Sequence, residues 1–299
     1  MTAGSTSTPA AKAAGMQGRV CLVTGATSGI GRETALGLAD RGAAVVIVAR
    51  DAARGRATVA DIRRQTGNAA VGMLKADLSS QEQVRGLARD FRARHPHLHV
   101  LLNNAGLITP TRSVTVDGVE TQFAVNHLAC FLLTHLLLDV LKAGTPSRIV
   151  NVASQVERLG VIDFDDLGRE KTPYDRLDAY YQSKLANVLF TYELARRLEG
   201  TGVTANCVHP GVIGTKLLQE YEGLPRPLRF MSKLNRPSPR EGATTSLYVA
   251  TAPELEGVSG CYFRESAESK SSPRSYDTAL ARRLWKESAK LTGLEQGRA

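Results

Sequence analysis

The sequence predicts a single α/β domain built on a doubly wound parallel sheet with helices on both faces. Short aliphatic segments alternate with amphipathic helical segments from residue 19 to about 210, which is the βαβ rhythm of parallel sheets. Runs such as Val45-Val46-Ile47-Val48 are apolar throughout, as expected of strands buried on both faces. The 299 residues show no internal repeat and no interdomain linker, so one domain accounts for the chain.

Each apolar run that is bounded by turn residues predicts a strand. The expected strands are Val20–Thr24, Ala44–Ala49, Ala70–Ala76, Val100–Asn103, Ser147–Ala153 and Thr204–Val208. Helices such as Gly31–Arg41 and Gln81–Arg94 connect them. Residues 1–17 are rich in Ala, Ser, Thr and Gly and predict a disordered lead before a domain of residues 18–299. A proline-containing stretch at about 212–240 predicts a substrate loop, the alternative being a surface helix-loop without a role.

Composition and charge narrow the class of protein. The formal net charge is +9, but no Lys/Arg run of five occurs and acids are interleaved, so we expect a solvated basic surface and no nucleic-acid partner. The most apolar window, 128–141, contains His135 and Asp139, which favours a buried helix over a membrane span. We therefore expect no membrane anchor.

The cysteines are isolated and form no metal-binding spacing. They are Cys21, Cys130, Cys207 and Cys261. Isolated thiols in apolar runs are typical of a reducing compartment, so we expect a cytoplasmic protein without a metal site.

A glycine-rich segment, residues 24–31, follows the first strand and opens a helix. Gly25 permits a tight turn, Gly29 lets the backbone approach a pyrophosphate, and Gly31 allows close helix–strand packing. The helix N-terminus offers free N–H groups to the phosphates. From this segment we assign to cofactor binding Gly25, Thr27, Ser28, Gly29, Ile30 and Gly31.

The end of the second strand predicts which cofactor binds. Ala49 and Arg50 stand where a cofactor site selective for NAD would need a carboxylate for the ribose hydroxyls. A guanidinium suits a ribose 2′-phosphate, so Arg50 indicates NADP(H), with Arg32 as a second candidate cation and Asp51 expected to point away. The alternative is that Arg50 is merely solvated.

A catalytic set is predicted around the helical segment near residue 180. Tyr180 and Lys184 are four residues apart and share one helix face. A nearby ammonium lowers the pKa of a phenol, which then exchanges a proton with a carbonyl oxygen. Ser154 ends a buried strand, where its hydroxyl can stabilise a developing oxyanion or simply cap a turn. Asn126, a polar residue in an apolar helix, either holds a proton-relay water or ties two helices together.

Further contacts with the cofactor are expected where other strands end. Asn104, Ala105 and Gly106 would lie beside a ribose, and Asp77 and Leu78 would reach the adenine. After the sixth strand, a segment expected to carry the nicotinamide contains Pro210, Gly211, Ile213 and Thr215.

Together these motifs resemble the short-chain dehydrogenase/reductase superfamily over about residues 18–215: TGATSGIG, NNAG, the Ser154–Tyr180–Lys184 set, Asn126 and HPG occur in the family's order. Three longer stretches, beginning at residues 117, 179 and 241, resemble its retinol dehydrogenase and WW-domain oxidoreductase branch. Ala153 departs from the second serine that this branch often carries. The Ala-, Arg- and Gly-rich composition resembles that of a soluble bacterial member.

The resemblance implies a seven-stranded Rossmann sheet, NADP(H), and hydride transfer between the nicotinamide and a bulky, largely apolar ketone, aldehyde or alcohol, with ketone reduction favoured. It implies Tyr180 as the acid/base, Lys184 as its tuner and a ribose contact, Ser154 as the group that orients the substrate, and Asn126 as support for the relay. Two alternatives stay open: a non-redox epimerase, cyclase or dehydratase on the same fold, and a binding protein that senses nicotinamide redox state. Apolar faces on the helices near 120–141 and 178–198 lead us to expect a homodimer or homotetramer.

Overall fold

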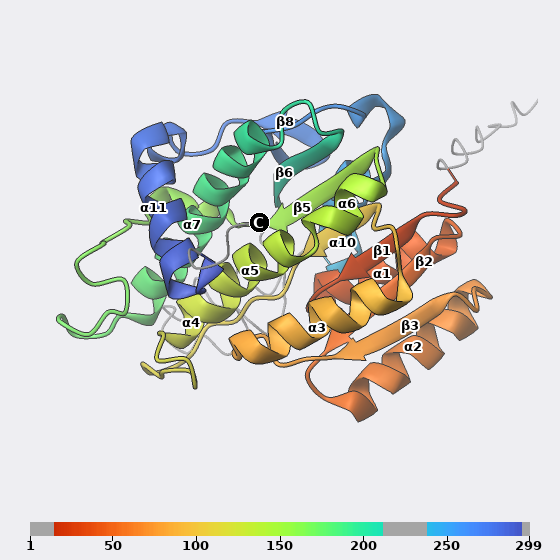
Figure 1. Ribbon diagram of the computed structural model, residues 1–299, viewed down its shortest axis with the longest axis horizontal. Coiled ribbons are helices and arrows are strands. Elements are labelled where there is room, and N and C mark those ends of the chain that lie inside the picture. The colour runs from red at the N-terminus through yellow and green to blue at the C-terminus, as the bar shows by residue number, and fades with distance from the viewer. Residues whose placement is uncertain (1–14, 212–237, 295–299) are drawn as a thin grey trace, which may run out of the picture.

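The computed structural model describes residues 15–211 and 238–294, which fold into one α/β domain (Figure 1). Its sheet has eight strands in the order β3-β2-β1-β4-β5-β6-β7-β8. The strands are β1 (Val20–Val23), β2 (Ala44–Ala49), β3 (Val71–Lys75), β4 (Val100–Asn103), β5 (Ser147–Val152), β6 (Val203–His209), β7 (Tyr262–Arg264) and β8 (Ala267–Ser269). The first seven are parallel, which confirms the predicted doubly wound sheet.

The eighth strand is an addition that the sequence did not indicate. β8 pairs antiparallel with β7 through a two-residue turn at Glu265 and Ser266, whose φ angles are 53° and 58°. Two-residue hairpin turns need positive φ at their centre and usually use Asn or Gly there. Because Glu and Ser are poor signals for such a turn, the hairpin is recognised only in the structure.

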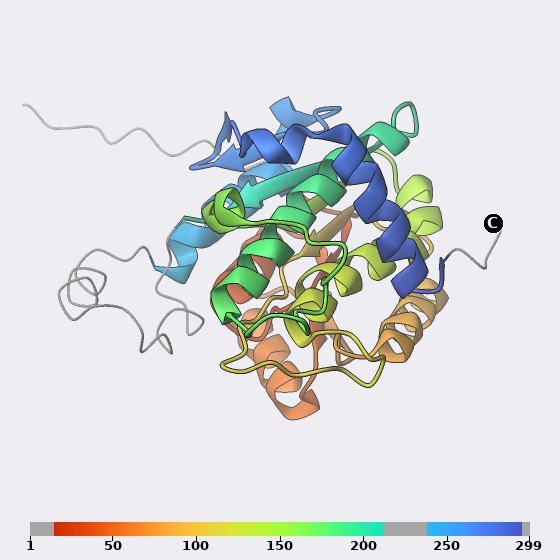
Figure 2. The same cartoon turned by 90° about the vertical axis from the view of Figure 1, so that its left-hand side faces the viewer.

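Two helical layers cover the sheet, as Figure 1 and Figure 2 show. One layer consists of α1 (Gly29–Asp40), α2 (Ala52–Thr66) and α10 (Pro239–Thr251), and the other of α3 (Gln81–Arg94), α5 (Ala129–Leu136), α6 (Leu138–Ala143) and α7 (Arg176–Arg197). Short helical turns occur at η2 (Gln155–Leu159), η3 (Pro253–Leu255) and η4 (Pro273–Tyr276).

The alternation of side chains along each strand fills both layers. On β1, Leu22 packs in the α3/α5/α7 layer, whereas Cys21 and Val23 pack in the α1/α2/α10 layer. All three are fully buried, because successive side chains of a strand point to opposite faces and both faces are covered. Unbroken apolar runs therefore mark the central strands.

Two predicted boundaries change in the structure. Met16 is 7% exposed and packs among the α1/α2/α10 core residues, and its N–H donates to the carbonyl oxygen of Arg41 at 2.7 Å. The expected disordered lead therefore does not include Met16, whose apolar side chain gains from burial. Residues 212–237 of the expected substrate loop lie outside the described residues. The last part of that expected loop includes the start of α10, at Pro239.

The apolar segment near residue 130 is interrupted rather than one regular helix. It comprises α4 (Thr121–Phe123), a π-helical turn η1 (Ala124–Leu128), α5 and α6. π-helical turns are rare in proteins, and those that occur are often at functional sites. This one contains Asn126. Among the described residues, no helix has the length and apolarity that a membrane span requires.

The last helix, α11 (Thr278–Leu291), lies against α7 and α5 (Figure 2). The Trp285 ring contacts those of Phe131 and Phe190, with centroids 5.2 and 5.8 Å apart. Ala281 and Leu284 are buried against α7. Part of the apolar face on which the expectation of self-association rested is thus covered by the chain's own C-terminal helix.

Candidate active site

The predicted site residues gather at the carboxyl edge of the sheet. The glycine loop follows β1, the segment 104–106 follows β4, Ser154 follows β5, and Pro210 follows β6. Because β1 and β4 are neighbours while their crossovers run to opposite sides, a crevice forms between their ends, where doubly wound sheets bind ligands.

The glycine loop and the segment after β4 fit together at backbone level. Gly25 has φ 64°, and a Cβ added there would lie 2.7 Å from the Cα of Ala105. A Cβ on Gly31 would collide with the Asn104 side chain. Asn104 Nδ2 donates to the carbonyl oxygens of Thr24 at 3.0 Å and Gly25 at 3.2 Å. Asn104 therefore holds the loop, and only glycine fits at both loop positions.

The N-terminus of α1 keeps donors available for an anion. Its N-cap, Ser28, makes no side-chain hydrogen bond to the first turn, which contains no acidic residue. In contrast, the N-cap side chains of α2, α3, α7, α10 and α11 all accept backbone N–H groups. Uncapped N–H groups next to Gly29, whose φ is 57°, suit the pyrophosphate of a dinucleotide.

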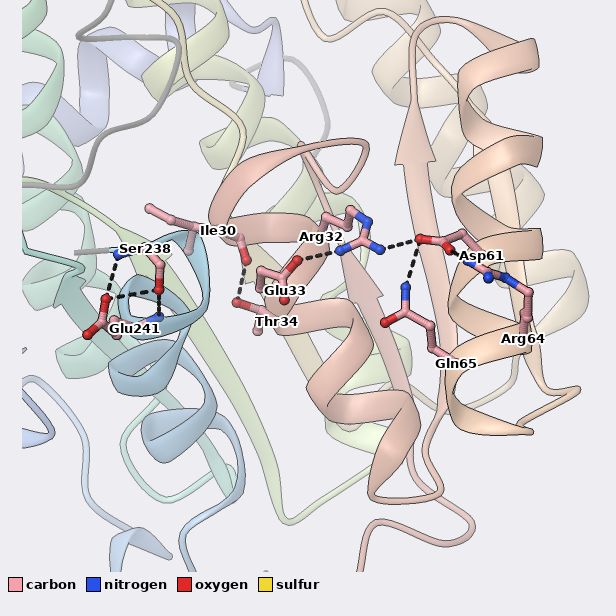
Figure 3. Close-up of polar contacts among 9 residues, drawn as sticks. All are labelled: Ile30, Arg32, Glu33, Thr34, Asp61, Arg64, Gln65, Ser238 and Glu241. Carbon is pink, nitrogen blue, oxygen red and sulfur yellow. Dashed lines mark hydrogen bonds and ion pairs between the residues drawn. The ribbon is translucent and has the colours of Figure 1, made fainter. Parts of the chain in front are cut away.

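The cations near the end of β2 differ in availability. Arg50 is exposed, and Asp51 is turned into α2 as its N-cap, accepting from the N–H of Arg54 at 2.8 Å. Arg32, the second candidate cation, is ion-paired with Glu33 and with Asp61 on α2 (Figure 3). Its guanidinium holds the pKa of Asp61 well below the ordinary value. Arg50 is thus the available cation of the two, and Arg32 ties α1 to α2.

Of the remaining residues that we expect to contact the cofactor, the structure describes some and not others. Asp77 Oδ1 accepts from the Ser79 N–H and hydroxyl at 2.9 and 2.7 Å, and Leu78 packs partly against the core. Pro210 is partly buried and Gly211 has φ 85°. Ile213, Thr215 and the rest of that segment lie outside the described residues.

The catalytic set does come together. Ser154 and Tyr180 lie on different elements, yet they are close enough for the Ser154 hydroxyl to lower the pKa of the Tyr180 phenol. Lys184 Nζ lies 5.5 Å from the Tyr180 ring centroid and donates to the carbonyl oxygen of Val152 at 3.1 Å. The i, i+4 spacing on α7 places both side chains on the face that meets the end of β5.

Burial dominates the protonation of both groups. It raises the pKa of Tyr180 well above the ordinary value, and the Ser154 hydroxyl lowers it. Burial also lowers the pKa of Lys184 to about 8. The sequence predicts a lowered phenol pKa; in this structure desolvation of the phenolate outweighs the effect of Ser154, and the pKa is raised. Tyr180 is consequently a protonated phenol at neutral pH, which can donate a proton.

Asn126 is fixed by both of its amide atoms. Its Oδ1 accepts from the Leu107 N–H at 2.8 Å, and its Nδ2 donates to the Leu107 carbonyl oxygen and to the Ser183 hydroxyl, both at 3.0 Å. Ser183 donates in turn to the Tyr180 carbonyl oxygen at 2.7 Å. Asn126 thus couples the segment after β4 to the catalytic helix. Sequence reasoning missed Ser183; its i+3 offset from Tyr180 was the available signal.

His209, the first residue of the HPG motif, also contacts the segment that follows β5. Its Nδ1 accepts from the Gln155 N–H at 3.1 Å, so it holds the residue that follows Ser154. Burial lowers its pKa to about 4, which keeps the ring neutral and able to accept. Its place at the end of β6, beside β5, was the available signal.

The fold and the site define a nicotinamide-type α/β oxidoreductase, and comparison with known proteins gives the family. The family model for short chain dehydrogenase matches residues 19–223. The chain is 47% identical over 279 residues to retinol dehydrogenase 12 of Homo sapiens, covering 93% of this chain and 88% of that protein. It is 46% identical over 279 residues to retinol dehydrogenase 11 of Mus musculus, covering 93% and 88%. The chain belongs to the short-chain dehydrogenase family.

Solved structures give the same result. A protein of Mycobacterium Paratuberculosis without assigned function superposes with a TM-score of 0.77 at 33% identity, covering 94% of this chain and 96% of that one. The Pseudomonas aeruginosa RhlG/NADP active-site complex superposes with a TM-score of 0.68 at 27% identity, covering 83% and 95%.

Proposed function

We propose that the protein is an NADP(H)-dependent oxidoreductase that transfers a hydride between the nicotinamide and a bulky, largely apolar ketone, aldehyde or alcohol. The observation that carries the proposal is the convergence of Ser154, Tyr180 and Lys184 at the edge where the glycine loop and the uncapped α1 N-terminus lie. One end of that crevice suits a pyrophosphate and the other suits proton transfer, which is what hydride exchange at a carbonyl needs.

In the direction of reduction, bound NADPH would supply the hydride to the carbonyl carbon. The Tyr180 phenol donates its proton to the carbonyl oxygen, so that hydride and proton together give the alcohol. The Ser154 hydroxyl donates a hydrogen bond to the same oxygen and orients it. Lys184 supplies positive charge that stabilises the tyrosinate left behind and contacts the ribose of the cofactor.

Two observations support NADP(H). Arg50 is exposed at the end of β2, and the Asp51 carboxylate is engaged in capping α2, which suits a ribose 2′-phosphate. The superposable RhlG complex contains NADP.

An apolar substrate is supported by the segment that follows Ser154. Leu159 and Val161 are 63% and 51% exposed, although large aliphatic side chains gain from burial. They lie five and seven residues after Ser154 in the chain, in the segment that we propose contributes to the substrate pocket. The relatives named above are retinol dehydrogenases, and retinol is itself a largely apolar alcohol.

A non-redox reaction, such as epimerisation, cyclisation or dehydration, is the second candidate. The intact proton-transfer pair of Tyr180 and Ser154 favours it as well, because such reactions also need an acid/base. The two candidates differ in whether cofactor absorbance changes in step with product.

We also propose a cytoplasmic location and self-association as a homodimer or homotetramer. Because α11 covers part of α5 and α7, such an assembly would use the surface that α11 leaves open.

The test of the proposed function is a panel of carbonyl compounds incubated with NADPH while cofactor absorbance and product are followed together. Stoichiometric oxidation of NADPH with alcohol formation is expected. Product formed while the absorbance stays constant would favour the non-redox candidate.

A further inference from the structure

A second cavity lies at the amino edge of the sheet, opposite the active site. Its volume is about 160 Å³, and it is lined where β1, β4 and β5 begin and where α10 ends. An apolar protein cavity of about 150 Å³ accommodates a molecule of the size of benzene, so this cavity suits a small ligand. A dinucleotide or a bulky apolar alcohol is too large for it.

Two arginines line this cavity without a carboxylate partner. Arg19 Nη1 donates to the Pro146 carbonyl oxygen at 3.2 Å, and Arg148 Nη1 donates to the Val249 carbonyl oxygen at 3.1 Å. Among the residues that the structure describes, neither guanidinium has a carboxylate oxygen within 4.0 Å. Each group is anchored through one nitrogen, and its other nitrogens remain available as donors.

The charges of these arginines oppose each other. Burial lowers the pKa of Arg148 most, the negative charge of Glu256 raises it, the positive charge of Arg19 lowers it, and Glu254 raises it. Glu256 also lines the cavity, but it is exposed and its charge is largely solvated. Bringing two partly buried like charges together is unfavourable unless an anion compensates them.

His99 adds a third donor with a fixed orientation. Its Nδ1 accepts from the Val20 N–H at 2.9 Å, so the proton of the neutral ring lies on Nε2. Burial and then Arg19 lower the pKa of His99, which keeps the ring neutral beside the arginines. The cavity thus combines two anchored guanidiniums with one imidazole N–H.

We propose that this cavity is a binding site for a compact oxyanion, such as inorganic phosphate, a small phosphomonoester or a small carboxylate, held by Arg19, Arg148 and the Nε2–H of His99. Planar guanidiniums pair with such oxygens in bidentate geometry. The site is independent of the dinucleotide crevice, because it lies at the other edge of the sheet. It takes a separate ligand whether or not the proposed reaction is correct.

The first experiment measures the thermal midpoint of the protein against the concentration of inorganic phosphate, with ionic strength held constant by sodium chloride. Binding to the folded state raises the midpoint by mass action. Glycerol phosphate and acetate, titrated in the same way, distinguish a phosphomonoester from a carboxylate. We expect Arg148→Gln to weaken phosphate binding on the order of tenfold, since it removes a charge-assisted donor.

Two matched variants control for charge and for the other anion site. Arg64→Gln removes an arginine whose side chain is 77% exposed on α2, and Arg50→Gln removes the cation at the carboxyl edge; both should keep the phosphate effect. For each variant, the thermal midpoint with phosphate is compared with the midpoint of the same variant without phosphate. A lower intrinsic stability of Arg148→Gln therefore does not affect the result.

Nuclear magnetic resonance of the histidine rings locates the anion. Phosphate should shift the ring signals of His99 and leave those of His209, at the carboxyl edge, unchanged. Equal phosphate binding in Arg148→Gln and wild type would overturn the proposal. So would loss of binding in Arg50→Gln alone, or a shift confined to His209, because the anion would then occupy the cofactor crevice.

Discussion

Lys184 Nζ donates a hydrogen bond of 3.1 Å to the carbonyl oxygen of Val152, two residues before Ser154. The lysine of α7 is therefore anchored to the end of β5, the strand that Ser154 follows. This contact fixes the ammonium between the Tyr180 ring and the end of β5. One side chain thus joins α7, which contains Tyr180, to the end of β5, which precedes Ser154.

Replacement of that lysine should impair two functions at once. Lys184→Ala is expected to lower turnover and to weaken NADPH binding, because the same ammonium serves the tyrosinate and the cofactor ribose. Stopped-flow absorbance gives the turnover, and quenching of Trp285 fluorescence or calorimetry gives the dissociation constant. Unchanged NADPH affinity in this variant would remove the lysine from the cofactor site.

Loss of the phenol should affect chemistry alone. Tyr180→Phe is expected to reduce turnover by about 10²–10⁴-fold, the usual contribution of a positioned general acid, while NADPH affinity stays nearly the same. The control is Tyr181→Phe, since the residue four positions after Tyr181 is Leu185 rather than a lysine. Full activity of Tyr180→Phe would show that another group transfers the proton.

Cofactor preference should depend on the end of β2. Arg50→Ala is expected to weaken NADPH binding by about 1–3 kcal/mol, the range for a lost hydrogen bond to a charged group, and to leave NADH binding almost unchanged. Titration of both cofactors against both proteins measures this. If the two affinities fall equally, Arg50 does not contact the 2′-phosphate.

Stability should fall in acid because of His127. Its ring is fully buried, with Nε2 2.8 Å from the Ser288 hydroxyl, and burial lowers its pKa from 6.5 to about 4. Between these values the unfolded chain binds more protons, so the free energy of unfolding decreases as the pH falls from 6.5 to 4. At about 1.4 kcal/mol per pKa unit, the loss is on the order of 3 kcal/mol.

The measurement is urea unfolding at several pH values for wild type and His127→Gln. The stability difference between them should shrink as the pH falls. A difference that is constant for His127→Gln would mean that the ring is not held neutral by burial.

Self-association should involve surface that α11 does not cover. Light scattering at micromolar concentration is expected to give a dimer or tetramer. Ala279→Arg, an exposed position on α11, should leave the mass unchanged if pairing avoids that helix. A monomer would contradict the proposal.

Local sequence patterns predicted the parallel sheet because each pattern depends only on residues that are close together in the chain. Runs such as Val45–Val48 report burial on both faces, and the glycines at 25 and 31 report positions where a Cβ does not fit. The Tyr180–Lys184 spacing reports a helix face. Backbone sterics and hydrophobic periodicity act over a few residues, so the sequence contains these features directly.

Other features exist only through contacts between distant segments. Three contacts join residues that are 29 to 57 positions apart in the chain. They are the ion pair of Arg32 with Asp61 and the hydrogen bonds of Asn126 with Ser183 and of His209 with Gln155. The same holds for the raised pKa of Tyr180 and for the packing of α11 against Phe131. By itself the sequence determined the first six strands, the glycine loop and the residue types of the candidate catalytic set. Only the tertiary structure decided which polar groups pair and how strongly burial shifts their pKa values, because desolvation and hydrogen bonding depend on what the rest of the chain places around each group.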